Sequence, residues 1–181
     1  MKKVISIILV LIAVFGLWFI FVKTSDTSNS QKINKVIGHP DASNATFIFD
    51  DGPITLKKGS NSQSVIPGGE LTQDTILTDT VGFGDINGDK KEDSVSAIAQ
   101  SGGGSGVFIY LGAYVSGPLD YKGSNAVFVG DRIEPKSISI SSDGVIIFKY
   151  LDRKPNEPYA AEPTVLTTKY FLYSKDSLVE R

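Results

Sequence analysis

The chain has 181 residues, which suits one domain with short accessory segments. Without Lys2, Lys3 and Lys23 it carries 15 basic residues (18 − 3) against 20 acidic ones, a balance that argues against a nucleic-acid-binding surface. It has no Cys, which excludes disulfides, thiol nucleophiles and Cys-bearing zinc sites, and its single His, His39, lies in a polar stretch poorly suited to a Ser-His-Asp triad.

Residues 4–22 form an apolar stretch without a charge, Pro or Asn. At about 1.5 Å per residue, a helix of this length matches a hydrocarbon core about 30 Å thick. The stretch is longer than the apolar region of a cleaved secretion signal, and Phe21-Val22-Lys23 offers no small-x-small cleavage site. We therefore expect residues 1–22 to form an uncleaved signal anchor, a single transmembrane helix.

The orientation of this anchor does not follow from charge alone, because Lys residues flank both of its ends. The short N-terminal tail favours a cytoplasmic N-terminus. We therefore expect a single-pass protein of the cell membrane whose residues 24–181 lie outside the cytoplasm.

Residues 23–44 are rich in Ser, Thr, Asn and Asp and show little apolar periodicity. Such a composition buries too little apolar surface to order itself, so this range is predicted to be a flexible polar linker with a reach of roughly 25 Å. The folded domain is expected over residues 45–181.

Within residues 45–181 the apolar residues recur with a period of two, which is typical of β-strands. Turn residues separate these segments, and no helical pattern of useful length competes with them. The predicted fold is all-β, either a small β-sandwich or an open barrel. We expect hairpins at 46–56 and 137–150, a central strand at 107–111, and further strands at 126–129 and 167–173.

The segment from Asp85 to Asp93 concentrates oxygen-bearing side chains at alternate positions. Asp85, Asn87 and Asp89 occupy positions 1, 3 and 5 of a short loop, and Asp93 occupies position 9. Calcium prefers six to eight oxygen ligands, and alternate residues of a curled loop point inward. We expect these four side chains and the backbone carbonyl of Lys91 to bind Ca²⁺.

Phe83-Gly84 followed by Asp85-Ile86-Asn87-Gly88-Asp89 and Asp93 resembles the calcium loops of FG-GAP repeats, and more distantly those of EF-hands and dockerins. The resemblance implies that the ligands are those same loop positions. A wider similarity, to a family of exported bacterial proteins of unassigned function, covers roughly residues 45–178. It rests on the loop together with Gly102–Gly106, Asn125–Ile133 and Asp152–Pro155, and it implies a fold but no activity.

Two positions depart from the EF-hand pattern. Position 6, usually Gly because the backbone there adopts a positive φ, is Lys90, so the turn is expected to be strained or differently shaped. Position 12, which holds a bidentate Glu in EF-hands, is Ser96, and the residues around it have the pattern of a strand. We therefore expect weak calcium affinity, about 0.1 to 1 mM, as in extracellular modules; the alternative is an Asp-rich turn without metal.

Two function classes remain open. The first is a non-enzymatic calcium-binding module, held at the membrane, that binds a protein or glycan partner of the cell envelope. The alternative is an envelope hydrolase that uses a pair of carboxylates drawn from Asp131, Asp152 and Glu157. No spacing in the sequence selects such a pair, so no catalytic residue is assigned.

Overall fold

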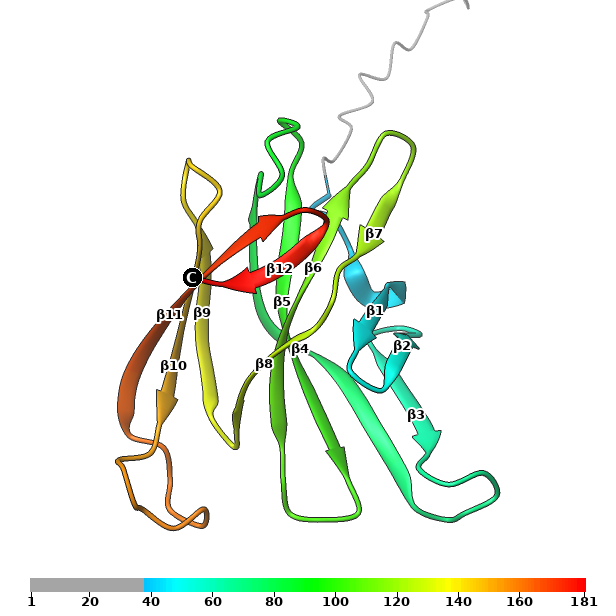
Figure 1. The fold of residues 1–181 in the computed structure, drawn as a ribbon, viewed down its shortest axis with the longest axis vertical. Coiled ribbons are helices and arrows are strands. Elements are labelled where there is room, and N and C mark those ends of the chain that lie inside the picture. The colour runs from blue at the N-terminus through cyan, green and yellow to red at the C-terminus, as the bar shows by residue number, and fades with distance from the viewer. Residues whose placement is uncertain (1–37) are drawn as a thin grey trace, which may run out of the picture. The chain divides into compact units, whose positions relative to one another are not determined.

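Twelve β-strands and one short 3-10 helix make up the part of the chain that the structure, a computed structural model, describes: residues 38–181 (Figure 1). In chain order these elements are η1 (Ala42–Asn44), β1 (Thr46–Phe49), β2 (Gly52–Thr55), β3 (Ser60–Ser64), β4 (Thr72–Gly84), β5 (Asp93–Gly102), β6 (Phe108–Ser116), β7 (Tyr121–Gly123), β8 (Val127–Asp131), β9 (Glu134–Ile140), β10 (Ile146–Asp152), β11 (Val165–Ser174) and β12 (Ser177–Glu180). The all-β prediction is confirmed for these residues.

The predicted anchor, residues 1–22, and most of the predicted linker lie outside the described residues. Across residues 38–181 no helix has the length and apolar character that crossing a membrane requires.

The last residues of the predicted linker are folded. Asp41 caps η1 by accepting the N–H of Ser43 at 2.9 Å. Ala42 is buried in one core cluster with Phe47 and Leu56. The flexible linker is therefore wrong for residues 42–44, because the small apolar side chain of Ala42 packs into the domain.

A sheet of six strands, in the order β3-β4-β5-β6-β7 with β8 also paired to β6, forms the larger layer (Figure 1). Its centre is β5, which is buried on both faces: Val95, Ala97 and Ile98 are all fully inaccessible. The predicted central strand, residues 107–111, falls in β6 and is confirmed as central, because β6 lies between β5 and the two strands β7 and β8.

A second sheet, of four strands in the order β12-β11-β10-β9, contains the hairpin predicted at 137–150 and the strand predicted at 167–173. Gly144, in the turn between β9 and β10, has a φ of +78°, which its lack of a Cβ permits. The main core joins this sheet to the first: Phe148 and Phe171 pack in one cluster with Val95 and Leu111.

The hairpin predicted at 46–56 is also confirmed and forms a separate two-stranded sheet of β1 and β2. Phe47 and Ile54 of this hairpin pack with Ile98, a residue of β5, in a second core cluster. The close approach depends on Gly112 in β6, since a Cβ there would lie 2.7 Å from the Phe47 ring. The large sheet is thereby covered on both faces.

Candidate functional site

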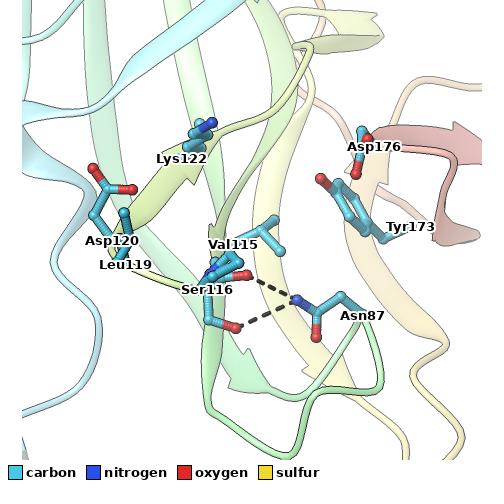
Figure 2. A pocket seen from close by; sticks show the side chains of 11 residues that line it. Asn87, Val115, Ser116, Leu119, Asp120, Lys122, Tyr173 and Asp176 are labelled. Atoms are coloured by element: carbon cyan, nitrogen blue, oxygen red, sulfur yellow. Dashed lines mark hydrogen bonds between the residues drawn. The ribbon is translucent and has the colours of Figure 1, made fainter.

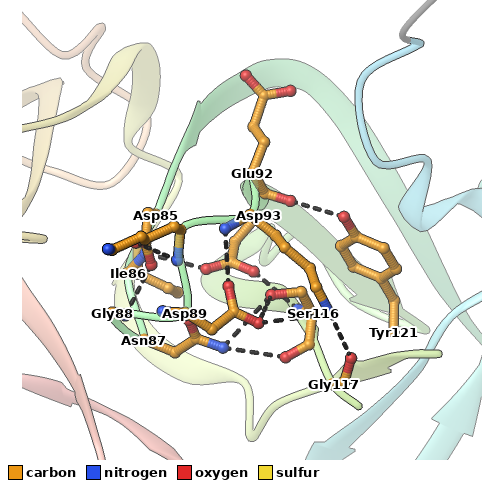
Figure 3. A network of polar contacts seen from close by, with 12 residues as sticks. Asp85, Ile86, Asn87, Gly88, Asp89, Glu92, Asp93, Ser116, Gly117 and Tyr121 are labelled. Carbon is orange, nitrogen blue, oxygen red and sulfur yellow. Dashed lines mark hydrogen bonds and ion pairs between the residues drawn. The ribbon is translucent and has the colours of Figure 1, made fainter. Parts of the chain in front are cut away.

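The predicted calcium loop connects two long neighbouring strands of the large sheet, β4 and β5 (Figure 3). It turns sharply at Gly88 (φ +83°) and at Lys90 (φ +66°). The positive φ of Lys90 confirms that position 6 carries the backbone conformation for which Gly is usual. A non-Gly residue in that conformation costs about 1 kcal/mol, which the loop's other contacts must offset.

The oxygen-bearing side chains at positions 1, 3 and 5 all turn back onto the loop's own backbone. Asp85 accepts the N–H of Gly88 at 2.6 Å through Oδ1 and the N–H of Lys90 at 2.8 Å through Oδ2. Asn87 and Asp89 each accept the N–H two residues further along the chain, at 2.9 and 2.8 Å. These local bonds explain why Asp and Asn occupy alternate positions, since their short side chains reach backbone N–H groups of the residues that follow.

Asp93, at position 9, is the first residue of β5 and is completely buried. Its Oδ2 accepts the N–H of Ile86 at 2.9 Å, and its Oδ1 accepts the N–H of Ser116 at 2.7 Å. The carboxylate thus fastens the start of the loop to the end of β6. Such charge-assisted bonds to backbone N–H groups offset the loss of hydration that burial imposes.

Ser116, at the end of β6, belongs to the site although the sequence did not point to it (Figure 3). Its hydroxyl donates to Asp89 Oδ2 at 2.7 Å, and its carbonyl accepts from Asn87 Nδ2 at 2.9 Å. The hydrogen bond from Ser116, together with the N–H of Lys91, lowers the pKa of Asp89 below its ordinary value and so favours the charged carboxylate.

Lys91, whose carbonyl was predicted as a ligand, also ties the loop to the rest of the domain. Its ammonium donates to the carbonyl oxygen of Gly117 at 2.9 Å and lies 3.9 Å from Asp89 Oδ2. Next to it, the backbone carbonyl of Glu92 accepts the hydroxyl of Tyr121 at 2.9 Å. Burial raises the pKa of Tyr121, and the nearby Asp93 carboxylate adds to that effect, so the phenol stays a donor.

The donor set matches calcium in chemical type, because all four predicted side chains present carboxylate or amide oxygens. Each of these oxygens can accept a hydrogen bond and still offer a second lone pair. However, residues 38–181 contain no group of three or more acidic or His side chains drawn together as a metal site would require. Calcium would therefore have to pull the carboxylates of the loop closer to one another.

Three neighbouring carboxylates repel one another when no cation lies between them. In the structure each of them faces N–H or O–H donors instead, and the Lys91 ammonium adds a positive charge beside Asp89. These donors and the ammonium offset part of that repulsion.

The residues just before the loop have clear structural roles. The ring of Phe83 stacks on the imidazole of His39 with centroids 4.1 Å apart, and His39 Nδ1 lies 2.7 Å from a carboxylate oxygen of Glu92. Gly84 lets β9 approach, since a Cβ there would lie 2.9 Å from Cβ of Ile140. The single His thus links the start of the domain to the loop.

A pocket of about 740 Å³ adjoins the loop (Figure 2). Asn87 and Ser116 form one part of its lining, Lys122 of β7 another, and Tyr173 and Asp176 lie across from Lys122. Burial raises the pKa of the Tyr173 hydroxyl, and the charge of Asp176 contributes. Asn87 thus belongs both to the loop and to the lining of this pocket.

The three carboxylates of the hydrolase alternative lie elsewhere but together: Asp131, Asp152 and Glu157 line one pocket of about 480 Å³. Asp131 is paired with the Arg132 guanidinium at 3.1 Å, and Glu157 lies 3.8 Å from the ammonium of Lys154. Asp152 accepts the N–H of its neighbour in the chain.

The chain matches no family model, and comparison with curated proteins and with solved structures finds no match either. The resemblance of residues 83–93 to FG-GAP and EF-hand loops therefore stays a prediction from the sequence.

Proposed function

We propose that this chain is a membrane-anchored, extracytoplasmic β-sandwich module that binds calcium in the loop from Asp85 to Asp93 and serves as a non-enzymatic interaction protein of the cell envelope. The observation that carries the proposal is the conformation of the loop. Side-chain oxygens at positions 1, 3 and 5 turn inward, and Lys90 takes the positive φ that such loops require.

The affinity for calcium is weak in this proposal, about 0.1 to 1 mM. The reason is that Lys90 strains the turn, and that Asp93 already uses both oxygens for buried backbone donors. A site of this affinity fills outside the cell and stays empty at cytosolic calcium levels. That requirement agrees with the export expected from the apolar stretch at residues 4–22.

The test is the thermal unfolding of residues 38–181 with chelator, with about 1 mM Ca²⁺ and with about 1 mM Mg²⁺. With Kd near 0.1 mM, about 1 mM Ca²⁺ stabilises the folded state by about 1.4 kcal/mol. We therefore expect the unfolding midpoint to rise by about 3 to 6 °C in calcium. Magnesium should raise it much less, because it gives up its water reluctantly and demands a tighter octahedron.

Asp89→Asn is the matched variant, because the amide keeps an oxygen acceptor for Lys91 N–H while the negative charge is lost. We expect its calcium-dependent rise to fall below about 2 °C. Asp79→Ala, which removes an exposed carboxylate on β4 away from the loop, should respond to calcium like the unaltered domain. A midpoint that ignores calcium in the unaltered domain would contradict the proposal.

The second candidate function is hydrolysis by Asp131, Asp152 and Glu157. All three carboxylates line the pocket of about 480 Å³, and this shared location supports the hydrolase. A glycosidase needs one carboxyl group that keeps its proton until it protonates the leaving group. In this pocket Asp131 and Glu157 each lie beside a cation, Arg132 and Lys154, and not in the apolar surroundings typical of such a proton donor. Release of shortened products from labelled envelope glycans, abolished in Asp152→Asn, would favour the hydrolase over the binding module.

A further inference from the structure

We propose that the pocket lined by Phe128, Asp152, Arg153 and Tyr159 is a binding site for a neutral saccharide. This inference rests on the proposed function in one respect: it names a glycan as the envelope partner. The pocket lies at the junction of β8, the end of β10 and the connection from β10 to β11. Its volume of about 480 Å³ is in the usual range of small-molecule sites, about 300 to 1,000 Å³.

The connection between β10 and β11 is tied down by hydrogen bonds to backbone carbonyl groups. Arg153 donates through Nε to the carbonyl of Ala161 at 2.7 Å and through Nη1 to the carbonyl of Asp131 at 3.2 Å. The N–H of Thr164 donates to the carbonyl of Asp152 at 2.8 Å and closes the base of the connection. A wall fixed in this way loses little entropy when a ligand binds.

Two exposed aromatic rings line this pocket. Tyr159 is 64% exposed, and its ring lies 4.8 Å beneath the guanidinium of Arg132. Phe128 is 48% exposed, and its ring lies in a tilted contact with Phe108 and an edge contact with Tyr110, with centroids 6.3 and 5.5 Å away. Two such rings on one pocket offer an apolar surface that a bound molecule can cover.

The polar groups of the pocket determine which ligand fits between such rings. The carboxylates of Asp131, Asp152 and Glu157 are balanced by Arg153, Lys154 and the neighbouring Arg132, so the site has no net charge. It therefore does not favour a phosphate or another anion. Within residues 38–181, neither Oδ2 of Asp152 nor Nη2 of Arg153 makes a hydrogen bond, which leaves one acceptor and one donor.

A sugar ring has the complementary chemistry: C–H groups on its faces for the aromatic rings, and hydroxyls around its edge that both donate and accept. Phe108, 40% exposed and in contact with Phe128, extends the apolar surface beyond the pocket and allows for a second ring of an oligosaccharide. The site is also separate from the calcium loop. Asp85 lies near Gly144, just before β10, whereas the pocket is at the other end of that strand, at Asp152.

The experiment is isothermal titration calorimetry on the full chain, in micelles of a detergent without a sugar headgroup. The probes are the neutral trimers of N-acetylglucosamine and of β-1,4-linked glucose, with trigalacturonic acid as the anionic counterpart. We expect at least one neutral trimer to bind with a Kd of about 0.1 to 1 mM and the anionic trimer to bind at least tenfold more weakly.

Variants of Tyr159 and Phe128 test whether binding depends on these two rings themselves and not on the general stability of the domain. Tyr159→Ala and Phe128→Ala should each weaken binding by about tenfold, and Tyr159→Phe should restore it because the ring remains. Tyr170→Ala removes a ring of similar exposure from β11, outside the pocket, and should bind as the unaltered chain does. Binding should persist when calcium is chelated, so this test is independent of the calcium melt.

Failure of both neutral trimers to bind, tighter binding of the anionic trimer, or full affinity in both Tyr159→Ala and Phe128→Ala would each overturn the saccharide site. The proposed calcium-binding module would remain intact in any of these cases, because its test concerns a different part of the fold.

Discussion

Replacing Asp93 with Ala is expected to lower the free energy of unfolding of the domain by about 3 kcal/mol. The fully buried carboxylate accepts the N–H groups of Ile86 and Ser116, and both of these donors are themselves buried. Ala leaves the two N–H groups without partners, and each unmatched buried group costs about 1 to 3 kcal/mol. The loss does not involve calcium, so it should appear in full when a chelator is present.

Urea unfolding of residues 38–181, followed by circular dichroism with chelator present, measures this effect. Asp93→Asn should lose less, about 2 kcal/mol, since its amide oxygen still accepts one of the two N–H groups while its NH₂ faces the other. Asp79→Ala, an exposed carboxylate on the same sheet, should change stability by less than about 0.5 kcal/mol. A loss of under about 1 kcal/mol for Asp93→Ala would mean that water reaches these donors.

The sequence predicted best those strands in which apolar residues alternate with polar ones and a turn sequence such as Asp-Gly lies beside them. The hairpins around Asp51-Gly52 and Asp143-Gly144 are of this kind, because Gly at these turns has a positive φ that other residues adopt at a cost. The strand predicted at 167–173 is rich in Thr, Tyr and Phe, which favour strands, and β11 confirms it.

The strands with only a partial signal in the sequence, as around Ser96 in β5, or with no signal, as in β4, lack that contrast. β5 runs from Asp93 to Gly102 with Ser and Ala at many positions, and nearly all of it is buried because both faces are covered. Without an exposed face, its polar and apolar residues do not alternate. β4 shows the opposite difficulty: most of its residues are only partly buried, so its apolar side chains form no regular series.

The candidate site also has one part that the sequence predicted and one part that it did not. The inward turn of Asp85, Asn87 and Asp89 follows from local spacing, and the sequence therefore predicted it. The part played by Ser116 could not be predicted, because it depends on the register between β5 and β6, which pairs Ser94 with Tyr114. Contacts between residues so far apart in the chain are set by how the whole sheet assembles rather than by any nearby pattern.

The packing of the two larger sheets gives the second large effect: Gly82→Ala is expected to lower the free energy of unfolding by about 2 to 3 kcal/mol. A Cβ at Gly82, in β4, would lie 2.6 Å from Cγ2 and 2.8 Å from the backbone oxygen of Ile138, in β9. Backbone cannot move aside as a side-chain tip can, so the two strands must separate and the core beneath them loses contacts.

Urea unfolding with chelator present also measures two further Gly variants, whose losses of stability should be smaller than that of Gly82→Ala. At Gly84→Ala the nearest atoms are Cγ2 and Cβ of Ile140, at 2.8 and 2.9 Å, and not a backbone oxygen. Ile140 is only partly buried, so a smaller loss of about 1 to 2 kcal/mol is expected. Gly38→Ala meets nothing within 4 Å and should leave stability unchanged. If Gly82→Ala unfolds at the same urea concentration as Gly38→Ala, then β4 and β9 do not approach as closely as this fold requires. A graded loss from Gly38 through Gly84 to Gly82 would instead support the close approach of β9 as the reason that β4 carries Gly at positions 82 and 84, immediately before the loop.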